Sequence, residues 1–109
     1  MAQAYKVLGQ IAPAATTATT IYTVPSATEA VVSSIVVCNR SAASATFRIS
    51  VRPNGASLAN QHYLAYDAGV GPNDTLILTV GITVDATDVL EGYASSGDLT
   101  FQAYGSEVS

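Results

Sequence analysis

Apolar and polar residues alternate in short runs along most of this chain, and turn-forming residues separate the runs. In residues 45–52, for example, Phe47, Ile49 and Val51 alternate with polar side chains. A period of two is typical of a β-strand with one buried side and one solvent-facing side. The same signals predict eight strands, at residues 5–10, 19–24, 30–39, 45–52, 62–68, 75–84, 89–94 and 99–104.

Glycine and proline mark the connections between these runs. Pro53-Asn54-Gly55 ends the fourth run, because proline lacks a ladder donor and Asn-Gly favours positive φ. The segments 69–74 and 95–98 carry further turn signals. Gly81, inside the run 75–84, predicts a bulge or a bend.

Eight short strands without a helical pattern predict an all-β fold. We expect a two-sheet antiparallel β-sandwich of jelly-roll or immunoglobulin-like type, and a small closed barrel is the alternative. The length of 109 residues predicts one domain, 1–109. The tail 105–109 and residues 12–18, which lack large side chains, are expected to be flexible or ordered by a partner.

The strand pattern also predicts which side chains are buried. Cys38 lies in an apolar run and is expected to be a buried thiol, and as the only cysteine it cannot form an internal disulfide. Tyr63 and Tyr66 should point to opposite faces of one strand, so that one of them becomes a candidate contact residue. The expected core residues are Val36, Phe47, Ile49, Val51, Leu76, Leu78 and Phe101.

The chain has few charges for its length. Only 11% of its residues are charged, against about a quarter in an average domain, whereas Ala, Ser and Thr fill 41 of the 109 positions. Such a surface can pack against other proteins without burying unpaired charges, although a stable secreted domain with an inert surface would look similar. The net charge of −4 argues against nucleic-acid binding. Neither a signal-peptide pattern nor an apolar run of membrane-spanning length occurs, so we expect synthesis in the cytoplasm and no membrane contact.

No residue pattern predicts catalysis, a metal or a cofactor. His62 is the only histidine; Ser57 and Asp67 are near it in sequence, but a hydrogen-bonded strand histidine is the simpler interpretation. One histidine and one cysteine are too few ligands for zinc. Asp85 and Asp88, or Asn73 and Asp74, could bind calcium, but turn formation is the better explanation of these residues. Glu91 and Asp67 could form a glycosidase pair, but nothing selects them over chance. Residues 69–71 are rich in glycine, but no helix follows them as a phosphate-binding loop requires.

Arginine and tyrosine provide the remaining candidate contacts. Arg48 and Arg52 share one strand face, for which a simple solvated face is the first interpretation; a local anchor for carboxylates is the alternative and is favoured over a basic patch. The six tyrosines suit either a half-buried core position or a contact with protein or sugar.

Several segments taken together resemble small β-sandwich virion proteins of tailed bacteriophages, especially phages of cyanobacteria and other aquatic bacteria. The resemblance covers nearly the whole chain and rests on the residue sequence of its strands, one after another, without a catalytic motif. The segments that carry it are Thr20-Ile21-Tyr22-Thr23-Val24-Pro25, residues 30–41 (AVVSSIVVCNRS), residues 45–51 (ATFRISV) and residues 60–67 (NQHYLAYD).

The resemblance implies a virion structural protein, and in the first instance a capsid decoration (cement) protein that binds the outside of the assembled shell. It implies the major capsid protein as partner, a homotrimer, and a place in the virion. A fibre or tail component that binds a receptor or glycan is the alternative. The expected partner-contact residues are Tyr5, Lys6, Arg40, Arg48, Arg52 and Tyr66.

Overall fold

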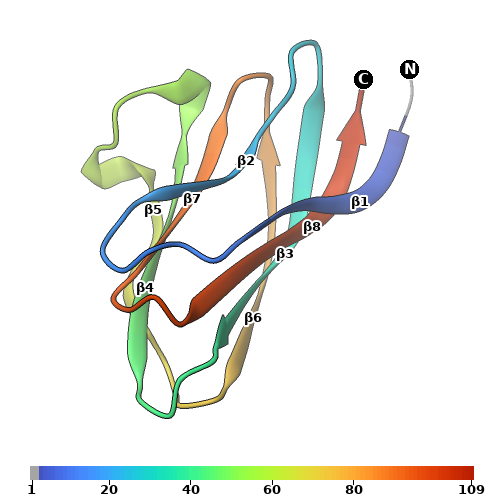
Figure 1. Ribbon diagram of the computed structural model, residues 1–109. Coiled ribbons are helices and arrows are strands. Elements are labelled where there is room, and N and C mark those ends of the chain that lie inside the picture. Colours follow the sequence, from blue (N-terminus) through green and yellow to red (C-terminus); the bar gives the residue numbers. More distant parts are fainter. Residues whose placement is uncertain (1–2) are drawn as a thin grey trace.

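The structure, a computed structural model, describes residues 3–109 and contains eight β-strands (Figure 1). The fourth, sixth and seventh strands have the predicted bounds. The strands are β1 (Gln3–Ile11), β2 (Thr19–Thr23), β3 (Glu29–Asn39), β4 (Ala45–Arg52), β5 (Tyr63–Val70), β6 (Thr75–Val84), β7 (Val89–Ala94) and β8 (Leu99–Val108). Within this part of the chain, no helix is long and apolar enough to cross a membrane.

The strands form two antiparallel four-stranded sheets. Sheet A has the order β1-β8-β3-β6 and sheet B the order β2-β7-β4-β5. The first strand therefore pairs with the last, the second with the seventh, the third with the sixth and the fourth with the fifth. This wrapping is that of an eight-stranded jelly roll. It confirms the predicted two-sheet sandwich and selects the jelly-roll type over the immunoglobulin-like type and the closed barrel.

The core lies between the two sheets and is centred on two phenylalanines. Phe47 of β4 and Phe101 of β8 meet edge to face, with ring centroids 6.2 Å apart. The burial predicted for Phe47, Ile49 and Phe101 is confirmed, since each is at most 1% exposed. Val51, Leu76 and Leu78 are only partly buried, because they pack at the margins of this core.

Two predictions for β3 are wrong. Ile35 and Val37 are fully buried, whereas Val36 and Cys38 point to the outer side of sheet A and are only half-buried. A register shift between Val32 and Ser34 sets which residues face the core. Residues 30–38 are apolar on both sides of the strand, so the sequence pattern does not distinguish one face from the other.

The tail 105–109, which was expected to be flexible or ordered by a partner, is instead largely a strand of this domain. β8 continues to Val108, and its last residues lie between β1 and β3, where Gly105 pairs with Lys6 on one side and with Val32 on the other. Pairing on both sides satisfies the backbone groups of this segment, which explains why these polar residues are ordered.

The loops carry the remaining predicted features. In the connection 12–18, Pro13 is buried and the Thr16 N–H donates to the Ala94 carbonyl at 2.8 Å; the flexibility of this segment stays a prediction. The long connection from β4 to β5 contains two short 3₁₀ turns, Pro53–Gly55 and Asn60–His62. Asn54 and Gly81 have positive φ, as the turn signals indicate.

A buried asparagine fixes the end of the sandwich where three loops meet. Asn39 is 1% exposed, and its Nδ2 donates to the carbonyls of Ala43 at 2.8 Å and Gly71 at 3.0 Å. Its Oδ1 accepts from the Ser41 N–H at 2.9 Å. One side chain thereby joins the β3–β4 loop to the β5–β6 turn.

Candidate functional site

An arginine on the outer side of sheet B organises a cluster of aromatic side chains. The Arg48 Nε donates to Asp67 Oδ1 at 2.7 Å, and a second guanidinium nitrogen lies 3.3 Å from Oδ2. The guanidinium carbon is 4.1 Å from the ring centroid of Tyr66 and 4.5 Å from that of Tyr93. The hydrogen bond with Asp67 raises the pKa of Arg48 above its ordinary value. The guanidinium is therefore held between a carboxylate and two rings.

Irregular pairing of β5 brings these residues together. The register between β4 and β5 shifts on both sides of Ile49, and Asp67 has a φ of 52°. As a result Tyr63 and Tyr66 lie on the same face, with ring centroids 4.9 Å apart, and the prediction that they point to opposite faces is wrong. Strict alternation fails wherever a strand contains a bulge.

Arg52 fixes the start of the β4–β5 connection. Its guanidinium pairs with Glu91 at 3.0 Å and donates to the carbonyls of Gly55 and Ala56 at 3.1 and 2.8 Å. Arg48 and Arg52 thus share a face and each binds a carboxylate of this chain, while their contact with a partner stays a prediction. The Arg52 side chain is only 20% exposed, and its charge is balanced by Glu91 of the same chain.

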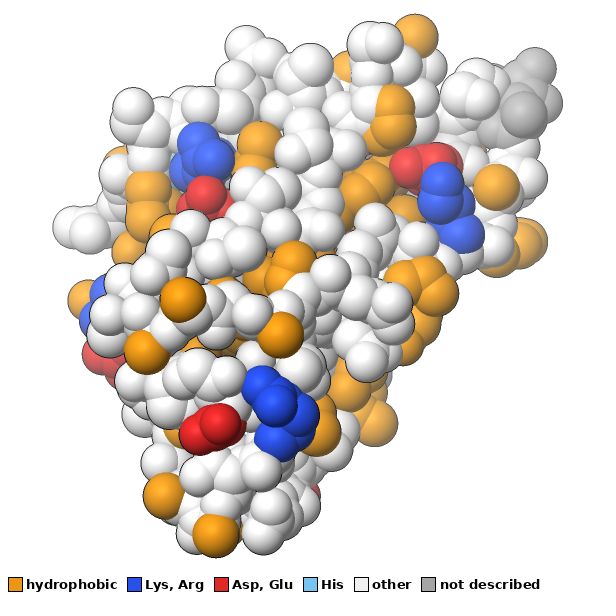
Figure 2. All heavy atoms as spheres, in the orientation of Figure 1, with side chains coloured by type: hydrophobic (Ala, Val, Ile, Leu, Met, Phe, Trp, Pro, Cys, Tyr) orange, Lys and Arg blue, Asp and Glu red, His pale blue; other side chains and the backbone are white. Residues whose placement is uncertain are grey.

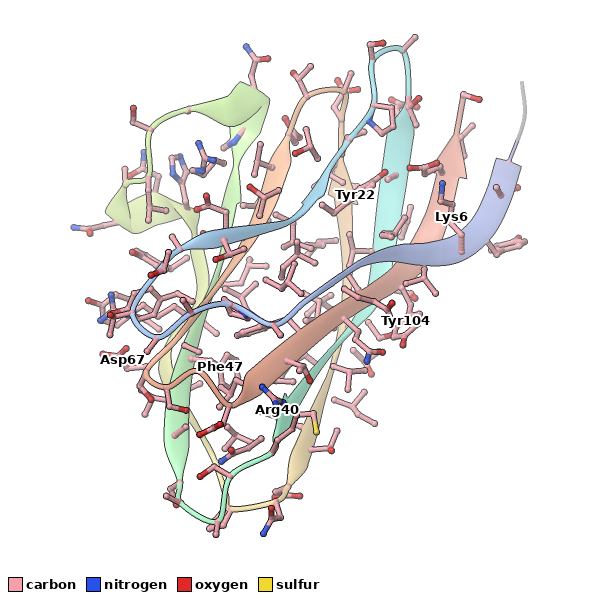
Figure 3. All side chains as sticks on the ribbon, in the orientation of Figure 1. Lys6, Tyr22, Arg40, Phe47, Asp67 and Tyr104 are labelled. Atoms are coloured by element: carbon pink, nitrogen blue, oxygen red, sulfur yellow. The ribbon has the colours of Figure 1, made fainter. Side chains whose placement is uncertain are left out.

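A second polar cluster joins the two sheets near the chain ends. Tyr22 of β2 donates its hydroxyl to Glu107 of β8 at 2.5 Å, and Lys6 of β1 pairs with the same carboxylate at 3.0 Å. Figure 3 shows Lys6 on β1 and Tyr22 on β2, which belong to different sheets. Burial raises the pKa of Tyr22, and the bond with Glu107 raises it further. The bonds from Tyr22 and Lys6 lower the pKa of Glu107.

We expect Glu107 to make stability depend on acid pH. Its pKa is lower in the folded state than in the unfolded chain, so its contribution is complete above the ordinary value of about 4.5 and is lost as pH falls through the folded pKa. Glu107→Gln should lower the melting temperature by a few degrees at pH 7 and by much less at pH 3. Thermal melts across this range measure the difference. Glu29→Gln, which changes an exposed carboxylate, is the control, and an equal loss for Glu107→Gln at both pH values would contradict the expectation.

The six predicted contact residues do not form one site. Arg48 and Tyr66 are together in the sheet B cluster, with Arg52 on the same face. Tyr5 and Lys6 lie on β1, in the other sheet, and Tyr5 is 82% exposed. Arg40 lies at the far loop end and donates to the Gly97 carbonyl at 3.0 Å, which joins the β3–β4 loop to the β7–β8 turn. Figure 3 shows Asp67 of the cluster and Tyr104 of sheet A on opposite flanks.

The outer side of sheet A carries one charged residue, Glu29 at the end of β3, and beyond it forms a continuous uncharged surface that the sequence prediction missed. Cross-strand pairing arranges its residues in rows that run across the sheet. We call this surface the sheet A outer face; its rows are Tyr5, Ser106, Val31 and Thr83; Val7, Tyr104, Ser34 and Thr79; Gln10, Gln102, Val36 and Ile77; and Thr100, Cys38 and Thr75. None of these residues is charged.

Large apolar side chains are exposed on the sheet A outer face. The exposed fraction is 82% for Tyr5 and 64% for Ile77. It is 47% for Val7 and 39% for Val31. Figure 2 shows hydrophobic side chains gathered along the flank over β8, β3 and β6. A shallow depression of about 500 Å³ lies between Tyr5, Val7, Val31 and Tyr104. Exposed apolar groups that gather on one face mark an interaction surface.

The residues considered for catalysis and calcium have structural contacts. His62 ends a 3₁₀ turn rather than lying in a strand, and its Nδ1 accepts from the Ala59 N–H at 3.0 Å. Asp88 accepts from the backbone N–H groups of Asn54 and Asp85, both at 2.8 Å, as the turn interpretation predicts. Within residues 3–109, no three side chains of His, Cys, Asp or Glu gather in a way that could hold a metal ion.

Comparisons with known proteins do not assign a family to this chain. No protein-family model matches it, and no curated protein matches it closely enough to be counted as a relative.

Proposed function

We propose that this protein is a capsid decoration protein, which binds the outside of an assembled bacteriophage shell and stabilises it. The observation that supports the proposal best is the sheet A outer face. The resemblance of the strand sequences to those of phage virion proteins supports it as well. A jelly roll is also common among viral coat proteins. The face presents hydroxyl, amide and apolar groups, and these can be buried against another protein without desolvating a charge.

The placement of the charges supports the same use. The ion pairs of Arg48 and Arg52 lie on sheet B, and that of Lys6 lies between the sheets at one end. Of the other carboxylates, Asp74, Asp85, Asp88 and Asp98 are in loops, and Glu29 lies at the end of β3, beyond the last row of the sheet A outer face. The net charge of −4 therefore keeps the chain soluble without interrupting the sheet A outer face. A protein that binds the shell, but not its dissociated subunits, stabilises the shell by mass action.

Particles assembled without this chain provide the test. Adding the purified protein back should restore resistance to heat and osmotic shock, and cryo-electron microscopy should show its density spread over the shell. Val31→Lys places a charge within the sheet A outer face, and we expect it to need at least about tenfold more protein for the same occupancy. Leu64→Lys, a change of the same kind at a 48% exposed position of sheet B, is the matched control.

Two results would contradict the proposal. Particles without the chain could prove as resistant as complete ones, which would remove the stabilising role. Val31→Lys could instead bind as well as Leu64→Lys, which would place the shell contact on another surface.

The sheet B cluster favours a second candidate function, a receptor- or glycan-binding module of a fibre or tail. Tyr66 is 58% exposed and lies beside the Arg48–Asp67 pair, so an aromatic ring and polar groups are presented together. Aromatic faces flanked by such groups can bind sugars, and jelly rolls also occur in lectins. Density confined to fibres or to one vertex in the same micrographs would favour this function over decoration.

A further inference from the structure

The four sheet margins differ in how well they are protected against pairing with another chain. An edge strand is protected by short length, by charges or by bulges. β2 has only five residues, β1 contains Lys6 and a register shift, and β5 contains Asp67 and two register shifts. β6 is the exception, since its ten residues include neither a charge nor a proline.

The first half of β6 is a regular and exposed edge. Residues 75–79 pair with β3 without interruption, and the irregularity at Gly81 comes only after them. Figure 1 shows β6 beside β3 at the margin of sheet A. Among the described strands only β3 pairs with β6, and none of the loop and turn backbone hydrogen bonds involves residues 75–84. The Thr75 N–H donates to Asp74 Oδ1 at 2.8 Å, and the other outward backbone groups of residues 75–79 remain available for another strand.

The sequence of this edge is palindromic. Residues 75–79 read Thr-Leu-Ile-Leu-Thr in both directions, centred on Ile77. If two copies paired antiparallel about a two-fold axis at Ile77, isoleucine would face isoleucine, each leucine would face a leucine and each threonine a threonine. Cross-strand pairs of these types stabilise antiparallel sheets, and no like charges would be opposed despite the negative charge of the chain.

We infer that the partner of the β6 edge is the β6 edge of a second copy of this chain. The contact is isologous and therefore closes with two copies. It would join the two A sheets into one sheet of eight strands, and the two sheet A outer faces would become one continuous surface. The homotrimer implied by the phage resemblance has a different mass, so the two expectations can be separated. The inference concerns the protein in solution and does not depend on its proposed role on a shell.

Sedimentation equilibrium of the full chain tests the dimer. One strand-to-strand contact is smaller than a standard interface, so we expect a monomer–dimer equilibrium at roughly 10–500 µM. Ile77→Lys should keep the chain monomeric over this range. It should still fold, because Ile77 is 64% exposed. Leu64→Lys, the same kind of change on the edge strand of sheet B, should dimerise like the wild type. A wild-type chain that stays monomeric or forms trimers would overturn the inference, as would an equal effect of both variants.

Cysteine cross-linking tests the register of the two strands. In a Cys38→Ser background, Ile77→Cys should form a disulfide-linked dimer under mild oxidation, because the two side chains face each other at the axis. Thr75→Cys should not, because Thr75 would face Thr79 of the second copy and two copies of Thr75 would be far beyond disulfide reach. Cross-linking through Thr75→Cys but not through Ile77→Cys would contradict the proposed axis.

Discussion

Phe47→Ala should lower the free energy of unfolding by about 3–5 kcal/mol, which is a large share of the stability of a domain of this size. The ring is 1% exposed and meets Phe101 edge to face across the two sheets. Removing it leaves a cavity at the centre of the core, where strands of both sheets hold the surrounding atoms in place. Chemical denaturation monitored by circular dichroism measures the loss.

Tyr5→Ala is the matched control for this substitution. It also removes an aromatic ring from a strand, but Tyr5 is 82% exposed, and we expect a change within about 0.5 kcal/mol. If Phe47→Ala proved as mild as Tyr5→Ala, the two sheets would not pack around Phe47 as described.

Gly105→Ala should destabilise the protein by about 3 kcal/mol although it adds a single methyl group. A Cβ at this position would lie 1.9 Å from the carbonyl oxygen of Val31 and 3.1 Å from the Cα of Val32. Both are backbone atoms of β3, so relief requires β8 to move away from its neighbour. Thermal and chemical denaturation measure the effect.

Gly69→Ala is the control, because Gly69 also lies in a strand and a Cβ there would meet no atom within 4 Å. We expect it to be neutral or slightly stabilising, through a less flexible unfolded chain. Equal stability of the two variants would indicate that residues 105–108 do not pack against β3 as described.

Local signals were sufficient for most of the strands. β4, β6 and β7 have the predicted bounds because alternation and turn residues are both encoded within a few positions. The inward face of β3 could not be predicted in this way, because Val36 and Val37 are equally apolar and only the bulge near Ser34 decides between them. The end of β8 was missed for a related reason. Its polar residues are ordered by β1 and β3, which are distant in sequence.

The candidate sites were predicted only in part. The shared face of Arg48 and Arg52 follows from their spacing, but the approach of Asp67 depends on a positive φ inside β5. The contact of Tyr22 with Glu107 joins residues 85 positions apart, and no local pattern indicates it. The uncharged rows of sheet A become visible only once the strand order β1-β8-β3-β6 is known. The palindrome at 75–79 can be read from the sequence, but its meaning depends on β6 being an edge.

The position of β8 between β1 and β3 has a consequence for how the chain folds. Lys6 and Glu107 are 101 residues apart, and β1 pairs with no strand of sheet A other than β8. During synthesis β1 therefore stays without its partner until all the strands between it and β8, and β8 itself, have been made. Closing so long a loop is slow compared with forming a hairpin. The rate-limiting step of folding should thus be the insertion of the C-terminal strand, and a nascent chain halted before residue 99 would lack the central partner of sheet A.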